Sequence, residues 1–111
     1  MKIPEEGYLL RVFVGESDKQ GHIPLYEAIV LKAREAGMGG ATVLRGLMGF
    51  GKRSVLHTAK ILRLSEDLPM VIEIVDSLEK IEAFLPTLDT MVLEGLVTLE
   101  KVRVIHYRAE K

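Results

Sequence analysis

Residues 69–92, PMVIEIVDSLEKIEAFLPTLDTMV, decide the fold class because they join a strand directly to a helix. The β-branched run Pro69–Asp76 predicts a strand. Ser77 is a good N-cap, since its hydroxyl can accept from an unpaired N–H of the first helical turn. Apolar residues then recur at helical spacing as far as Val92. Pro86 lies within this helix, where we expect a kink because proline removes a backbone hydrogen bond.

Similar strand and helix patterns occur before and after this segment in the sequence. Tyr8–Val14 predicts a strand, and Pro24 begins a helical pattern that ends at Gly37. Further strands are predicted over residues 41–48, with a bulge at Gly46, and over residues 96–107. Residues 55–64 fit strand or helix and are interpreted as strand. The order β-α-β-β-α-β predicts one α+β domain over residues 1–111, a ferredoxin-like fold whose antiparallel sheet carries both helices on one face.

Alternation along the strands divides the sheet residues into two sets. The set that faces the helices is predicted to form the core with helix residues, namely Leu10, Val12, Ile29, Ile72, Ile74, Phe84, Leu88 and Val102. The opposite set is half apolar, with interleaved charges: Leu9, Arg11, Phe13, Val71, Glu73, Val75, Leu99, Arg103 and Ile105. Such an apolar face exceeds what most monomers expose, which predicts self-association. A partly apolar face left in solvent is the alternative.

The composition excludes several classes of protein. The chain has 111 residues, no cysteine and a net charge of −1. The lack of cysteine excludes disulfides, thiolate zinc sites and cysteine nucleophiles. The balanced charge predicts no nucleic-acid binding, and no apolar run approaches the roughly 18 residues of a membrane-inserted helix. The N-terminal residues 1–6 do not resemble a signal peptide, so we expect a cytoplasmic protein. No catalytic constellation occurs, so we expect no enzyme.

One glycine-rich segment could hold an anion. Residues 46–52, GLMGFGK, have the spacing of a Walker loop, but Arg53 stands where that motif needs Ser or Thr. The segment fits a generic anion site better than a Walker loop, because its glycines expose backbone N–H donors beside Lys52 and Arg53. A hairpin tip with solvated basic residues is the alternative. The scattered histidines His22, His57 and His106 do not form a metal-ligand pattern, so no metal is expected.

From Ala41 to Val75 the chain resembles the PII signal-transduction proteins. The resemblance rests on Thr42-Val43, Gly49-Phe50-Gly51-Lys52, His57-Thr58 and Ile72-Glu73-Ile74-Val75. Over nearly its whole length the chain looks like the PII-like family of small bacterial and archaeal proteins of unknown function. Typical phrases are Gly15-Glu16-Ser17-Asp18, Pro24-Leu25-Tyr26-Glu27-Ala28, Arg45-Gly46 and Leu64-Ser65-Glu66-Asp67-Leu68-Pro69.

The resemblance implies a homotrimer that binds an adenine nucleotide (ADP, AMP or ATP) between subunits and regulates a partner, such as a membrane transporter, through a flexible loop. The nucleotide-binding residues it implies are Thr42, Arg45, Gly49, Phe50, Gly51, Lys52, Arg53, Glu73, Val75, Lys101 and Arg103. The PII Gly-Asp-Gly-Lys loop is replaced by Leu93-Glu94-Gly95-Leu96, which favours a diphosphate or monophosphate over ATP. A divalent-metal-binding trimer of the cation-tolerance type, which has the same fold, is the alternative function.

Overall fold

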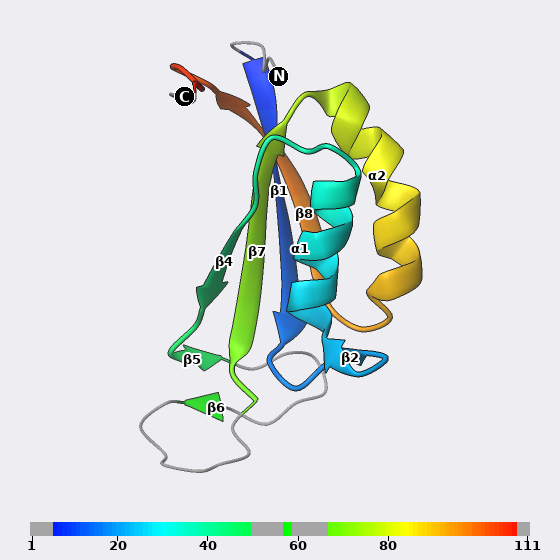
Figure 1. Cartoon of the computed structure of the whole chain (residues 1–111). Helices are drawn as coiled ribbons and strands as arrows, with labels where there is room; N and C mark the ends of the chain where they lie inside the picture. The colour runs from blue at the N-terminus through cyan, green and yellow to red at the C-terminus, as the bar shows by residue number, and fades with distance from the viewer. Residues whose placement is uncertain (1–5, 50–56, 59–66, 109–111) are drawn as a thin grey trace.

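Four antiparallel strands form the main sheet. The computed structural model describes residues 6–49, 57–58 and 67–108. The strand order is β4-β7-β1-β8, where β4 is Thr42–Arg45, β7 is Pro69–Asp76, β1 is Glu6–Gly15 and β8 is Leu96–Arg103. Helices α1 (Leu25–Glu35) and α2 (Leu78–Met91) both lie on one side of this sheet (Figure 1). This arrangement confirms the predicted ferredoxin-like α+β fold.

Two short hairpins accompany the sheet. Strand β2 (Lys19–Gln20) pairs with β3 (Ile23–Pro24) just before α1, and β5 (Met48–Gly49) pairs with β6 (His57–Thr58) beyond β4. The rest of the predicted strand 55–64 lies outside the described residues. No helix among the described residues is long and apolar enough to cross a membrane.

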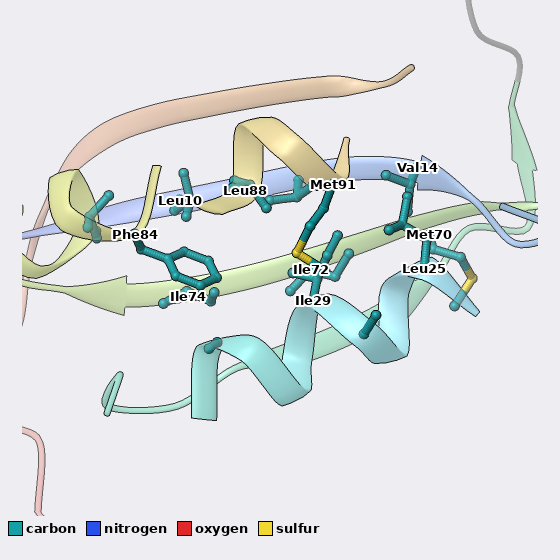
Figure 2. Close-up of a cluster of buried hydrophobic side chains, with 14 residues drawn as sticks. Leu10, Val14, Leu25, Ile29, Met70, Ile72, Ile74, Phe84, Leu88 and Met91 are labelled. Carbon is teal, nitrogen blue, oxygen red and sulfur yellow. The ribbon is translucent and has the colours of Figure 1, made fainter. Parts of the chain in front are cut away.

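The core lies between the helices and the sheet (Figure 2). Seven of the eight residues predicted for it are 3% exposed or less: Leu10, Val12, Ile29, Ile72, Ile74, Phe84 and Leu88. Alternation on β1 and β7 therefore identifies the buried side of both central strands. The predicted N-cap of α2 is also confirmed, because the Ser77 side chain accepts a hydrogen bond from the Lys80 N–H. The helix continues through Pro86.

The prediction for the eighth core residue, Val102, is wrong. Val102 pairs with Gly7 and Leu99 pairs with Leu10, and directly opposed residues share one face of a sheet. Leu99 and Arg103 therefore lie on the helix side and Val102 on the opposite side, the reverse of the prediction. The sequence of β8 has apolar residues in both alternation sets, so only its pairing with β1 fixes the register.

Two of the predicted strands also differ in extent from the strands of the structure. The strand predicted over residues 41–48 is divided, because Gly46 separates β4 from β5. The Gly46 N–H donates to the Pro69 carbonyl at 2.7 Å, and a Cβ at Gly46 would lie 2.7 Å from the Pro69 ring. Strand β8 ends at Arg103 rather than at Tyr107.

Candidate functional site

The predicted nucleotide-binding residues fall at three levels along the sheet. Arg45 and Gly49 lie at the end where β7 begins, and Lys101 and Arg103 lie at the end where β1 begins. The third group, Thr42, Glu73 and Val75, lies between these ends on the side of the sheet away from the helices. The four predicted residues 50–53 (Phe50, Gly51, Lys52 and Arg53) lie outside the described residues.

At the end of the sheet where β7 begins, the Arg45 side chain already pairs with Glu16. Arg45 Nη2 lies 3.0 Å from both carboxylate oxygens of Glu16. The Glu16 N–H donates to the Leu68 carbonyl at 2.8 Å, which fixes the backbone that carries this carboxylate. A phosphate at this end would have to share Arg45 with Glu16.

Glycines at this end leave room for the side chains of Asp67 and Pro69, which lie just before and at the start of β7. A Cβ on Gly49 would lie 3.0 Å from the Pro69 ring, and one on Gly15 would lie 2.7 Å from the Asp67 carboxylate. The Asp67 carboxylate in turn accepts from the Ser17 N–H at 2.8 Å. These contacts hold the start of β7 against the segments on either side of it in space.

The middle level carries a charged triad, Arg11, Glu73 and Glu100. Arg11 Nε donates to Glu73 at 3.0 Å, and Arg11 Nη1 donates to Glu100 at 2.8 Å. The hydrogen bond to Glu73 raises the pKa of the Arg11 guanidinium above its usual range, and the nearby charge of Glu100 adds to this. Thr42 lies directly opposite Glu73 on the edge strand. Arg11 and Glu73 were predicted to lie on this side of the sheet, whereas Glu100 was not, because the prediction for Val102 had the two sides of β8 reversed.

At the far end an open hollow of about 490 Å³ is lined by Glu6, Lys101, Val102 and Arg103. Lys101 Nζ lies 2.9 Å from a Glu6 carboxylate oxygen. The hydrogen bond to Glu6 raises the pKa of the Lys101 ammonium above its usual range. The hollow therefore combines two cations, one carboxylate and one apolar side chain.

The two ends are too far apart to act on one phosphate group within a single chain. Arg45 and Val14 both oppose Met70, which places Arg45 level with Val14, whereas Arg103 opposes Glu6. The eight-residue rise along β1 between these levels is about 26 Å. One chain thus presents two separate groups of basic residues.

A side-chain cluster that sequence analysis missed holds the turn between α1 and β4. The fully buried Asp76 carboxylate accepts from the Gly39 N–H at 2.8 Å and from the Ser77 N–H at 2.7 Å. Lys80 Nζ donates to the Gly37 carbonyl, and the Tyr107 hydroxyl donates to the Gly39 carbonyl. The glycine-rich turn can be recognised in the sequence. Its hydrogen-bond partners Asp76, Lys80 and Tyr107 cannot, because they are 37 or more residues away along the chain.

Within residues 6–49, 57–58 and 67–108, no three His, Cys, Asp or Glu side chains gather as a metal-binding group. The described part of the site thus consists of ion pairs, glycine contacts and one hollow.

Sequence comparisons identify relatives along almost the entire chain. The sequence model of the DUF190 family, described as an uncharacterized ACR, matches residues 7–104. A UPF0166 protein of Aquifex aeolicus (strain VF5) is 40% identical over 98 residues, which are 88% of this chain and 92% of the relative. A UPF0166 protein of Methanocaldococcus jannaschii is 35% identical over 103 residues, which are 92% of this chain and 93% of the relative.

Solved structures share the fold at low identity. CPII, a nitrogen regulatory PII-like protein from Thiomonas intermedia K12 bound to ADP, AMP and bicarbonate, has a TM-score of 0.61 at 18% identity, over 89% of this chain and 88% of CPII. A protein from Thermus thermophilus described as PII-like has a TM-score of 0.64 at 19% identity, over 90% of each chain. CutA from Synechococcus elongatus PCC7942 has a TM-score of 0.59 at 11% identity, over 94% of this chain and 81% of CutA. These likenesses confirm the expected PII-like fold.

Proposed function

This chain belongs to the DUF190 family, and from its PII-like fold and its basic hollow we propose that it is a PII-like regulatory protein that binds an adenine nucleotide between the subunits of a homotrimer. The observation that carries the proposal is the hollow lined by Lys101 and Arg103. Its volume of about 490 Å³ is within the usual range of small-molecule sites. Lysine and arginine are the side chains that bind phosphate best.

The hollow is open, so a second wall must come from elsewhere. The basic residue Arg45 lies about 26 Å along the sheet in the same chain, which is too far to contribute. A neighbouring copy could bring its own loop end, with Arg45 and Gly49, against the Lys101 end of this chain. The PII-like neighbour CPII, whose structure contains ADP and AMP, supports an adenine nucleotide as the ligand.

We propose that the role is regulatory, cytoplasmic and non-catalytic. In this proposal the nucleotide is sensed at the base of the segment from Gly49 to about Lys60, most of which lies outside the described residues. That segment then contacts a regulated protein, such as a membrane transporter. In this arrangement each nucleotide would contact the Lys101 end of one copy and the loop end of a neighbouring copy.

Isothermal titration calorimetry with ADP, AMP and ATP tests the ligand. We expect micromolar to submillimolar affinity, weakened roughly tenfold or more by Lys101→Ala, because a charge-assisted hydrogen bond is lost. Lys32→Ala is the matched control, since Lys32 is also an exposed lysine paired with a glutamate, Glu35, but lies on α1. Lys32→Ala should bind like the parent.

Two results would count against the proposal. The absence of binding by all three nucleotides at millimolar concentration would exclude an adenine nucleotide as the ligand. Equal affinity in Lys101→Ala and the parent, with both proteins folded by circular dichroism, would exclude the hollow as the phosphate site.

A further inference from the structure

The hollow at the end where β1 begins holds a carboxylate beside its two cations. Glu6 is the first residue of β1 and lies directly opposite Arg103 on β8. A Glu6 carboxylate oxygen lies 2.9 Å from Lys101 Nζ. Opposed and diagonal residues of neighbouring strands share one face of a sheet, so Glu6 is within reach of both cations. An anion that enters the hollow therefore meets Glu6 as well as Lys101 and Arg103.

Strand pairing holds the Glu6 backbone in this place. The ladder between β1 and β8 runs from the pair Glu6–Arg103 to the pair Phe13–Leu96. The Glu6 side chain itself is 68% exposed. An exposed ion pair contributes little to folding stability, so a change at Glu6 leaves the fold intact and its effect on ligands can be measured alone.

The charges that line the hollow largely cancel. Lys101 and Arg103 contribute two positive charges and Glu6 contributes one negative charge, which leaves +1. AMP, ADP and ATP carry about two, three and four negative charges near pH 8, because a terminal phosphate group then carries about two. Every one of these ligands thus has more charge than the hollow neutralises.

Geometry places Glu6 close to any phosphate that Lys101 binds. Two anions that both contact Lys101 Nζ at hydrogen-bond distance lie no more than about 6 Å apart. A phosphate group on Lys101 is therefore repelled by the Glu6 carboxylate at short range, or must displace it. The repulsion grows with the charge of the ligand.

We propose that Glu6 is a specificity-determining residue of the hollow, which competes with the ligand for Lys101 and lowers affinity more for each added phosphate. The proposal rests on the proposed function, since it concerns the same phosphate site, and it adds the residue that selects among mono-, di- and triphosphates. ATP would otherwise gain most from two adjacent cations. A built-in repulsion that removes this advantage is a recognised means of specificity.

A carboxylate in a nucleotide site can also have the opposite role. It can accept a hydrogen bond from a ribose hydroxyl or from the adenine amino group, and it then strengthens binding. The contact of Glu6 with Lys101 favours the competing role, because the carboxylate occupies the side chain that phosphate needs. The two roles predict opposite effects of Glu6→Gln.

Calorimetric titration without divalent cations measures the effect of Glu6→Gln on AMP, ADP and ATP. We expect tighter binding than in the parent, by roughly threefold for AMP and rising to about tenfold for ATP at about 20 mM salt. At about 300 mM salt these gains should fall to about twofold or less, because screening weakens the repulsion. Inorganic phosphate, pyrophosphate and tripolyphosphate should show the same rise, since the effect does not involve adenine.

Glu35→Gln is the matched control. Glu35 is also an exposed glutamate paired with a lysine, Lys32, but it lies on α1. The two variants change the net charge of the chain by the same amount, so Glu35→Gln should bind every ligand like the parent. An equal gain in both variants would overturn the proposal, because overall charge and not Glu6 would then cause it.

Further outcomes separate this proposal from the proposed function. Weaker nucleotide binding in Glu6→Gln, or a gain that does not rise with the charge of the ligand, would overturn the role of Glu6 and leave the nucleotide site intact. A rising gain for the inorganic anions in a protein that binds no adenine nucleotide would support the role of Glu6 and exclude the proposed ligand. A parent and a Glu6→Gln variant that bind neither series would overturn both proposals.

Discussion

Gly95 connects α2 to the edge strand β8 at a point where no side chain fits. Its φ is 157°, and a Cβ there would lie 2.5 Å from the Phe13 carbonyl oxygen. We expect Gly95→Ala to lower the free energy of unfolding by roughly 1–3 kcal/mol, because the backbone of β1 must move or the turn must strain. Gly40→Ala is the control, since nothing lies within 4 Å of a Cβ at that position. Urea unfolding measures both, and an equal small effect in the two variants would contradict the contact.

At the scale of single residues, the sequence predicted which side of β1 and β7 each charged residue occupies, but it did not predict which residues pair. Alternation placed Arg11 and Glu73 on the same side of the sheet, and the structure shows that they pair with each other, which the sequence did not predict. The third member of the triad, Glu100, depends on which β8 residue faces which β1 residue, and no local pattern reports this. The predicted phosphate ligands Arg45 and Lys101 are each paired with a glutamate that sequence analysis did not connect to them.

At the scale of elements, Asp76 ties the end of β7 to the turn that follows α1. Both carboxylate oxygens accept backbone N–H groups, from Gly39 and Ser77. An amide at this position would place its own N–H₂ against one of these donors, so we expect Asp76→Asn to cost about 1–3 kcal/mol of unfolding free energy. Hydrogen exchange at the Gly39 amide should accelerate more than exchange in the centre of β1.

The control for this prediction is Asp89→Asn, which changes an exposed aspartate on α2. It should leave both the unfolding free energy and the Gly39 exchange rate near the parent values. If Asp76→Asn did the same, the buried carboxylate would not be holding the turn.

The type of each main element could be predicted, whereas its pairing could not. Strong signals such as the run 69–76 and the Ser77 cap depend on neighbours in sequence, and both are confirmed. The register of β8 depends on Gly7 and Leu10, some 90 residues earlier, and the prediction for Val102 failed there. Weak alternation on an edge strand does not determine which side is buried.

At the scale of the whole molecule, the half-apolar side of the sheet away from the helices, which carries Leu9, Phe13 and Val71, predicts that the protein self-associates in solution. Sedimentation equilibrium at micromolar concentration should give about three times the chain mass of 12.4 kDa. Phe13→Asp should dissociate the assembly, because Phe13 lies between Val71 and Leu96 on this side of the sheet and an unpaired buried charge costs several kcal/mol. A monomeric parent would contradict the interface, and a dimeric parent would contradict the trimer.

The position of β1 in the sheet has a consequence for how the chain acquires its structure. This strand is synthesised well before β7 and β8, yet it sits between them. Its pairing with β8 joins residues 6–13 to residues 96–103, so most of the sheet forms through contacts that are very distant in sequence. Such contacts slow folding, because long loops must close before any pairing is gained. A ribosome therefore releases all the residues between these strands before β1 finds its second neighbour. Until then, β1 has an unpaired edge and exposed apolar residues, and both features favour aggregation of an incompletely folded chain.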